Sequence, residues 1–216
     1  MAEKNPSDLI MKFVKGKSAI PGETRTDLSG MTEEGLAKGF KTGFMFEVAS
    51  FTFKCGISGD ESEGGAAKKK EVKYGKDNKP LKPSSAGEFK KWRSGERTQP
   101  YPVDMQPVEF TRAIDKASVG MLDDCVKRVN YDSATLIKRK AAGGKAAGEV
   151  FLRFDFTGVL ITSLEWANDE PILETCEFIT RAVTVFYRPQ LPDGSLGGTI
   201  QGFWSMVPDM SPATIA

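Results

Sequence analysis

Histidine is absent from the 216 residues, and this absence excludes several classes of site. A Ser-His-Asp triad, a Cys-His pair and every zinc site with a histidine ligand are impossible. Cysteine is scarce too: Cys55, Cys125 and Cys176 lie far apart and show no C-x-x-C spacing. We therefore expect three small buried thiols in a reducing compartment rather than a disulfide framework. No carboxylates have the spacing of a metal loop, so we expect no metal ion, no other cofactor and no enzyme.

Net charge and long apolar runs are lacking as well. The 30 basic and 29 acidic residues give a net charge of +1. A nucleic-acid partner is not expected, because phosphate binding needs a basic face. The balance also removes most long-range repulsion between identical copies. No run approaches the ~18 apolar residues of a membrane span, and the N-terminus lacks the apolar segment of a signal peptide. We therefore expect no membrane insertion, and export only by a route without a signal peptide.

What the sequence contains is period-two alternation, which is typical of strands with one buried face. In "GEVFLRFDFTGVLITSLEW", residues 148–166, the length of the run predicts a strand bent or bulged at Gly158. "ETCEFITRAVTVFYRPQ", residues 174–190, is apolar on both faces, which predicts cover on each side by the core or by a partner. Further strands are predicted within residues 7–14, 43–57, 106–114, 133–141 and 197–206. Hairpin turns are predicted at Gly143–Gly144 and in "LPDGS", residues 191–195.

One amphipathic helix is predicted to begin at Ser118 and to stop near Asn130, a residue suited to the left-handed conformation. Asp115, Lys116 and Ser118 could be interpreted as a catalytic Ser-Lys cluster. Capping is favoured instead, because a hydroxyl at a helix start satisfies a backbone N–H and a nearby carboxylate suits the positive end of the dipole. The apolar face that we expect to pack on the sheet comprises Met121, Leu122, Cys125, Val126 and Val129, with Asp123, Asp124, Lys127 and Arg128 on the solvent side.

Two segments, residues 21–43 and 56–107, interrupt the strand pattern. The second interleaves Lys and Arg with Tyr74, Phe89 and Trp92, as proteins that bind single-stranded nucleic acid do. Acidic residues cut through the same segment and cancel much of its field, which favours a solvated or protein-binding loop.

Six short motifs occur in one order along the chain. They are "PGET" from Pro21, "FEVASFTF" from Phe46, "EFTRAIDKAS" from Glu109, "MLDDC" from Met121, "ATLIKRKAAGG" from Ala134 and "FYRPQLPDGSLGG" from Phe186. In this order the chain resembles the Hcp family (haemolysin-coregulated protein), the inner-tube subunit of type VI secretion systems. Both long segments exceed the usual family length.

The resemblance implies a mainly β fold: a small β-barrel of two packed antiparallel sheets with one flanking α-helix and long loop insertions. It implies a single domain over residues 1–216, with insertions at 21–43 and 56–107. It also implies homohexameric rings that stack into a hollow tube, which sheath contraction drives out of the bacterial cytoplasm to the extracellular space or a target cell. Sheath, spike and baseplate proteins and effector cargo in the lumen would be the partners.

The open alternative is a phage tail-tube-like protein or a free-standing protein-binding module with the same barrel. Within the tube interpretation, we expect Phe89, Trp92 and Tyr101 to anchor the long loop on a neighbouring subunit, because exposed aromatic side chains are costly unless a partner covers them. We expect Asp115 and Ser118 to fix how the helix joins the barrel.

Overall fold

The computed structural model describes residues 8–24, 26, 35–57, 103–140, 148–168, 172–192 and 195–206. The chain divides into two compact units, Cys55–Met105 and the rest. In the smaller unit the described residues form two antiparallel strands, β5 (Cys55–Ile57) and β6 (Val103–Met105). Because Ile57 pairs with Val103, the two ends of the long insertion are held side by side.

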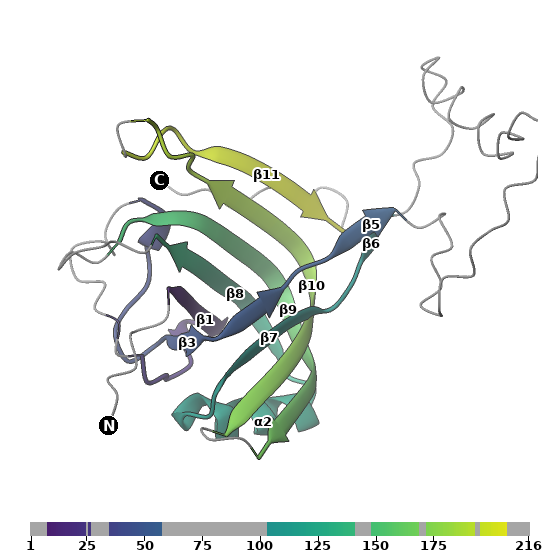
Figure 1. Ribbon diagram of the computed structural model, residues 1–216. Coiled ribbons are helices and arrows are strands. Elements are labelled where there is room, and N and C mark those ends of the chain that lie inside the picture. Colours follow the sequence, from purple (N-terminus) through teal and green to yellow (C-terminus); the bar gives the residue numbers. More distant parts are fainter. Residues whose placement is uncertain are drawn as a thin grey trace, which may run out of the picture. The chain divides into compact units, whose positions relative to one another are not determined.

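The larger unit is built on one sheet of nine strands (Figure 1). A short 3₁₀ helix, η1 (Gly35–Ala37), and the α-helix α2 (Lys116–Val126) accompany the sheet. The strands are β1 (Leu9–Lys15), β2 (Ser18–Ala19), β3 (Phe46–Val48), β4 (Ser50–Thr52), β7 (Val108–Ala113), β8 (Asn130–Arg139), β9 (Val150–Ala167), β10 (Leu173–Tyr187) and β11 (Ile200–Ser205).

The sheet closes on itself through the segment that holds β3 and β4. Hydrogen-bonded neighbours run from β1 through β8, β9, β10 and β7 to β4. β3, which precedes β4 by one residue, pairs back with β1, and Ala49 N donates to Thr111 O between the two strands. Opposite sides of the barrel also meet, since the Phe13 ring of β1 lies 5.7 Å from the Phe178 ring of β10. The predicted barrel is therefore confirmed.

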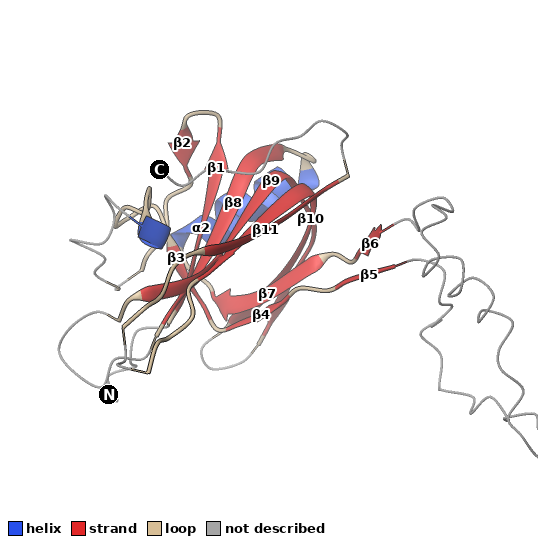
Figure 2. Ribbon diagram, turned by 90° about the horizontal axis from the view of Figure 1, so that it is seen from above, coloured by secondary structure: helices blue, strands red, loops and turns tan. Residues whose placement is uncertain are grey.

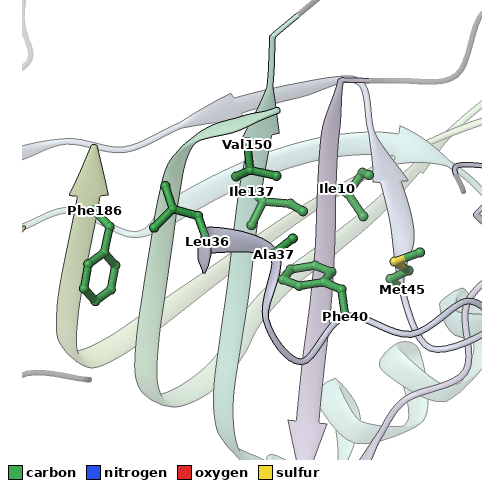
Figure 3. Close-up of a cluster of buried hydrophobic side chains, with 8 residues drawn as sticks. All are labelled: Ile10, Leu36, Ala37, Phe40, Met45, Ile137, Val150 and Phe186. Atoms are coloured by element: carbon green, nitrogen blue, oxygen red, sulfur yellow. The ribbon is translucent and has the colours of Figure 1, made fainter. Parts of the chain in front are cut away.

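Two groups of apolar side chains cover the two faces of the sheet. Aromatic residues fill the barrel interior, where Phe13, Phe110 and Phe178 contact one another as rings. On the other face the chain around η1 folds over the strands, so part of the expected insertion at 21–43 belongs to the core. Figure 3 shows this second cluster, made of Ile10, Leu36, Ala37, Phe40, Met45, Ile137, Val150 and Phe186.

The irregularity predicted at Gly158 is divided between two positions. Gly158 has a left-handed φ of 65°, which glycine adopts at no steric cost. The pairing of β9 with β10 nevertheless keeps its register across Gly158 and shifts between Glu177 and Phe178. Opposite that shift, Thr162 is the extra residue of β9, and its hydroxyl donates to Glu177 O. Gly158 is therefore an irregular position, as predicted, and the bulge in the pairing lies four residues beyond it.

Helix α2 lies at one end of the barrel, and β11 lies toward the other (Figure 1). Seen from above, α2 is on the far side, behind β8 and β9 (Figure 2). The bonded residues agree with the pictures. Ile114, just before the helix, donates to Ile172 O at the start of β10, whereas β11 pairs with Ala182–Tyr187 at its end.

Candidate functional site

A buried ionic joint connects β7, β10 and α2. Arg112 of β7 is fully buried, and its guanidinium stacks over the Phe46 ring at 4.1 Å. Its Nε donates to Glu174 Oε1 at 2.7 Å, and Glu174 is equally buried. Trp166 Nε1 donates to the other oxygen of that carboxylate at 2.8 Å. A buried pair of charges needs such complete hydrogen bonding, because desolvation otherwise outweighs the attraction.

The same arginine holds the start of the helix. Its Nη1 donates to Asp115 Oδ1 at 2.8 Å and its Nη2 to Ser118 Oγ at 3.0 Å. Asp115 is the N-cap, accepting from Ala117 N, and the Ser118 hydroxyl accepts from Asp115 N in return. Such a reciprocal capping box satisfies backbone donors that the first turn leaves open.

The position of the cap therefore differs from the prediction. The helix begins three residues earlier than expected, with Asp115 as the cap and Ser118 inside the first turn. Asp115 Oδ2 also accepts from Glu23 N at 3.1 Å, which ties the "PGET" segment to the helix. The buried Ser118 hydroxyl is already bonded to Arg112 and Asp115, whereas Lys116 is exposed. This geometry favours a structural joint over a Ser-Lys catalytic pair.

A second polar anchor holds the middle of the helix. Asp124 was predicted on the solvent side, but it is buried. Its carboxylate accepts from Lys15 Nζ at 2.6 Å and from Tyr131 OH at 2.8 Å. Burial, and then the hydrogen bond to Asp124, raise the pKa of Tyr131 far above its ordinary value. The tyrosine therefore stays a neutral donor to Asp124.

These two anchors turn the helix away from the predicted orientation. The buried residues of α2 are Ala117, Ser118, Met121 and Asp124. Leu122, predicted to pack on the sheet, is 37% exposed, and Val126 is 75% exposed. The end of the helix also differs from the prediction, because Arg128, not Asn130, adopts the left-handed conformation, with a φ of 55°. Hydropathy alone misplaced the packed face because polar residues occupy part of it.

Most of the exposed large apolar side chains of the described residues fall into two groups. The first, which we name the α2 stripe, comprises Ile114, Val119, Leu122, Val126 and Ile172. The second, which we name the β11 group, comprises Tyr187, Leu191, Ile200, Phe203 and Met206. The two groups lie at opposite ends of β10. Exposed apolar side chains gathered on a surface, rather than scattered singly, favour association with a partner.

Strand β10 bears on the prediction of two covered faces. All its even-numbered residues from Glu174 to Phe186 are buried. These residues do not all lie on one face, because Phe178 points into the barrel whereas Phe186 belongs to the cluster around η1. Both faces of β10 therefore carry buried side chains, while Ile179 and Tyr187 remain exposed, so the chain itself covers each face in part.

Three predicted interface residues, Phe89, Trp92 and Tyr101, lie outside the described residues, as do the predicted turn at Gly143–Gly144 and residues 193–194 of the "LPDGS" turn. The segments that flank each of these turns nevertheless pair in an antiparallel manner. β8 pairs with β9, and Leu191 N donates to Ser195 O at 2.9 Å. The hairpins predicted at these places are therefore present.

The thiols follow the prediction only in part. Cys176 is buried, Cys125 is half-buried and Cys55 is exposed, and all three are free. Burial raises the pKa of the Cys176 thiol far above its ordinary value, which leaves it unreactive. Among the residues that the structure describes, no three His, Cys, Asp or Glu side chains form a group that could hold a metal ion. In the same residues no helix is both long and apolar enough to cross a membrane.

Two cations fix the chain around η1 to the sheet. Lys12 Nζ donates to Gly39 O at 2.7 Å and lies over the Phe40 ring. Arg153 Nη1 donates to Leu36 O and Lys38 O, each at 3.1 Å. Burial, followed by the nearby charge of Arg153, lowers the pKa of Lys12 to about 8. These cations serve the core and define no binding site.

Comparison with known proteins relates this architecture to a single family. The profile described as "Type VI secretion system effector, Hcp" matches residues 56–187, more than half of the chain. Over 108 residues the chain is 30% identical to the protein hcp1 of Pseudomonas aeruginosa, a match covering 48% of this chain and 65% of that protein. The chain therefore spans slightly less than two thirds of that relative.

Solved structures agree at the level of the fold. A type six secretion system protein superposes with a TM-score of 0.58 at 21% identity, covering 92% of this chain and 94% of the other. A type VI secretion system effector from Yersinia pestis superposes with a TM-score of 0.53 at 15% identity, covering 92% and 99%. With the match of the family profile, these likenesses lead to one conclusion: the chain belongs to the Hcp family of type VI secretion systems.

Proposed function

We propose that the chain is the repeating subunit of a hollow tube, in which six copies close into a ring and rings stack on one another. The observation that carries this proposal is the placement of the α2 stripe and the β11 group at opposite ends of β10. A ring requires two different, mutually complementary surfaces on each subunit, because the contact is head to tail. The net charge of +1 adds little repulsion between copies.

The proposal gives the chain a structural role rather than a catalytic one. The tube would assemble in the bacterial cytoplasm, contact sheath, spike and baseplate proteins, and leave the cell without a signal peptide when the sheath contracts. Small effectors would travel in its lumen. The joint around Arg112 supports this role, since it holds α2 in one orientation on the barrel.

Within the tube, we propose that Phe89, Trp92 and Tyr101 anchor the long insertion on a neighbouring subunit. Deletion of residues 60–100 tests this idea. Because β5 and β6 pair at the base of the insertion, a short linker between them can replace it while the barrel stays folded. Rings or tubes should then be impaired, and intact stacking in the shortened chain would count against these anchors.

Native mass spectrometry of the purified full chain tests the function itself. A dominant species of six copies is expected, because a head-to-tail contact that closes gives one defined ring size. The spectrum should be recorded over a range of concentrations. A monomer at all of them would remove the tube and favour the free-standing binding module.

A further inference from the structure

We propose that the α2 stripe of one copy docks against β11 of the next copy, so that these two surfaces form the contact that repeats around the assembly. This inference rests on the proposed function and goes beyond it by naming both surfaces. Each surface has its own structural reason to be covered by another copy.

The α2 stripe cannot be buried by a movement within its own subunit. Val119, Leu122 and Val126 follow the spacing i, i+3, i+7 and so line one side of the helix. The opposite side is held by the bonds of Asp124 to Lys15 and Tyr131. Rotating the helix to bring the stripe inward would break these bonds and leave the buried Tyr131 hydroxyl without its acceptor, at the full desolvation cost of an unpaired buried donor. The stripe therefore stays outward and needs a partner from outside.

Strand β11 is an edge strand without the usual protection. Within the described residues it pairs with β10 along one side, and no other strand pairs with it. Ile200 lies opposite Tyr187 and Phe203 opposite Thr184, so exposed apolar side chains extend from both faces of β11. Natural edge strands are normally shielded by charged residues or proline, and residues 195–206 contain neither.

The two surfaces suit each other better than either suits itself. Beside the stripe, the exposed Asp123 and Lys127 pair with each other at 2.6 Å, and residues 195–206 contain no charged side chain, so the contact leaves neither of these two charges unpaired. Two α2 stripes docked together would give a twofold dimer and leave β11 exposed. Docking the stripe on β11 covers both with one repeated contact. Because the two surfaces lie at opposite ends of β10, the α2 stripe and β11 of one subunit cannot contact each other, and each must contact another copy.

A charge placed in the stripe gives the first test. Val126→Glu alters a side chain that is 75% exposed, so the unfolding midpoint of the monomer should stay unchanged. The matched control is Ile179→Glu, which puts the same charge on an exposed apolar position that belongs to neither surface. Self-association measured by analytical ultracentrifugation should weaken about a hundredfold in Val126→Glu, as for a charge buried at an interface centre, and little in the control.

Cross-linking between copies gives the second test. In a chain with Cys55→Ser and Cys125→Ala, the variants Val126→Cys and Phe203→Cys are combined and treated with a short bismaleimide. A head-to-tail contact joins each copy to the next, so denaturing gels should show a ladder of dimers, trimers and larger species. The single variant Val126→Cys should give no ladder. Dimers from that variant alone would instead show stripe-to-stripe contact and overturn the inference.

The outcomes separate this inference from the function on which it rests. If the unmodified chain never assembles, the tube proposal and this contact fail together. If the chain and the Ile179→Glu control assemble and Val126→Glu assembles equally well, the tube proposal stands and the docking of α2 is wrong. If Val126→Glu blocks assembly but no ladder forms, α2 contacts a surface other than β11, which also overturns the inference. The inference is supported if Val126→Glu loses assembly and the variant with both Val126→Cys and Phe203→Cys gives the cross-linked ladder.

Discussion

Replacing Arg112 by methionine should be among the most damaging single substitutions in the barrel. The change keeps most of the apolar side-chain volume and removes the guanidinium that bonds Glu174, Asp115 and Ser118. Asp115 keeps two backbone donors, Ala117 N and Glu23 N. Glu174 is fully buried and keeps Trp166 Nε1 as a donor. The main cost is therefore the carboxylate left without its countercharge.

The size of the effect follows from those bonds. Two of the lost hydrogen bonds join charged groups, each contributing about 1.5–3 kcal/mol, and the third is an ordinary bond of about 1 kcal/mol. The measured cost of breaking one side of a buried pair is about 3–5 kcal/mol. The bonds together give about 4–7 kcal/mol, so the two estimates overlap at about 4–5 kcal/mol, which is a large part of the stability of an ordinary domain.

Urea unfolding followed by tryptophan fluorescence measures this loss, and Trp166 reports directly on the joint because it bonds Glu174. The chain should be kept at concentrations where it is monomeric, since assembly adds to apparent stability. The double variant Arg112→Met with Glu174→Leu is the control and should recover most of the loss, because an apolar pair of similar volume replaces the ion pair well. A cost below about 1 kcal/mol for Arg112→Met alone, the range of exposed ion pairs, would refute the buried joint.

Four further predictions concern the same unit. Asp115→Ala should cost about 1–2 kcal/mol in urea unfolding through loss of the helix cap, and an unchanged midpoint would show that the cap does not matter. Met121→Ala should cost about 2–5 kcal/mol but Leu122→Ala much less, because the first is buried and the second partly exposed, and the reverse order would restore the orientation expected from hydropathy. Gly158→Ala should cost about 1–3 kcal/mol because its φ is left-handed, whereas a neutral result would mean that β9 relaxes there. The pKa of Lys12 is lowered to about 8 from 10.5, so the folded state binds fewer protons between these pH values and the free energy of unfolding should rise as pH increases through them. After allowance for its partial exposure the rise is about 1–2 kcal/mol, and Lys12→Met should abolish it; a slope that persists in the variant would assign it to another group.

The strands could be predicted from the sequence because their side chains obey the period of two. The same alternation contains a signal for the joint. In β7, Val108, Phe110 and Arg112 share the buried face, and an arginine at such a position predicts a buried partner of opposite charge. Glu174 on the buried face of β10 is the matching signal.

The helix was harder to predict, since its packed face is chosen by bonds between residues far apart in the chain. Asp124 turns inward because Lys15 and Tyr131 donate to its carboxylate. Lys15 is 109 residues away in the chain, and Tyr131 lies beyond the end of the helix on β8, so the periodicity of the helix reveals neither partner. The cover around η1 escaped prediction for a related reason. Leu36 and Phe40 lie in a glycine-rich stretch without a clear period, and only the folded sheet gives them a surface to cover.

Electron micrographs of the purified, unmodified chain test most directly whether identical copies join flank to flank. Annular particles with an open centre, some of them stacked end on end, are expected. A field of solitary compact particles at every protein concentration would contradict the assignment, whatever the stability of the barrel.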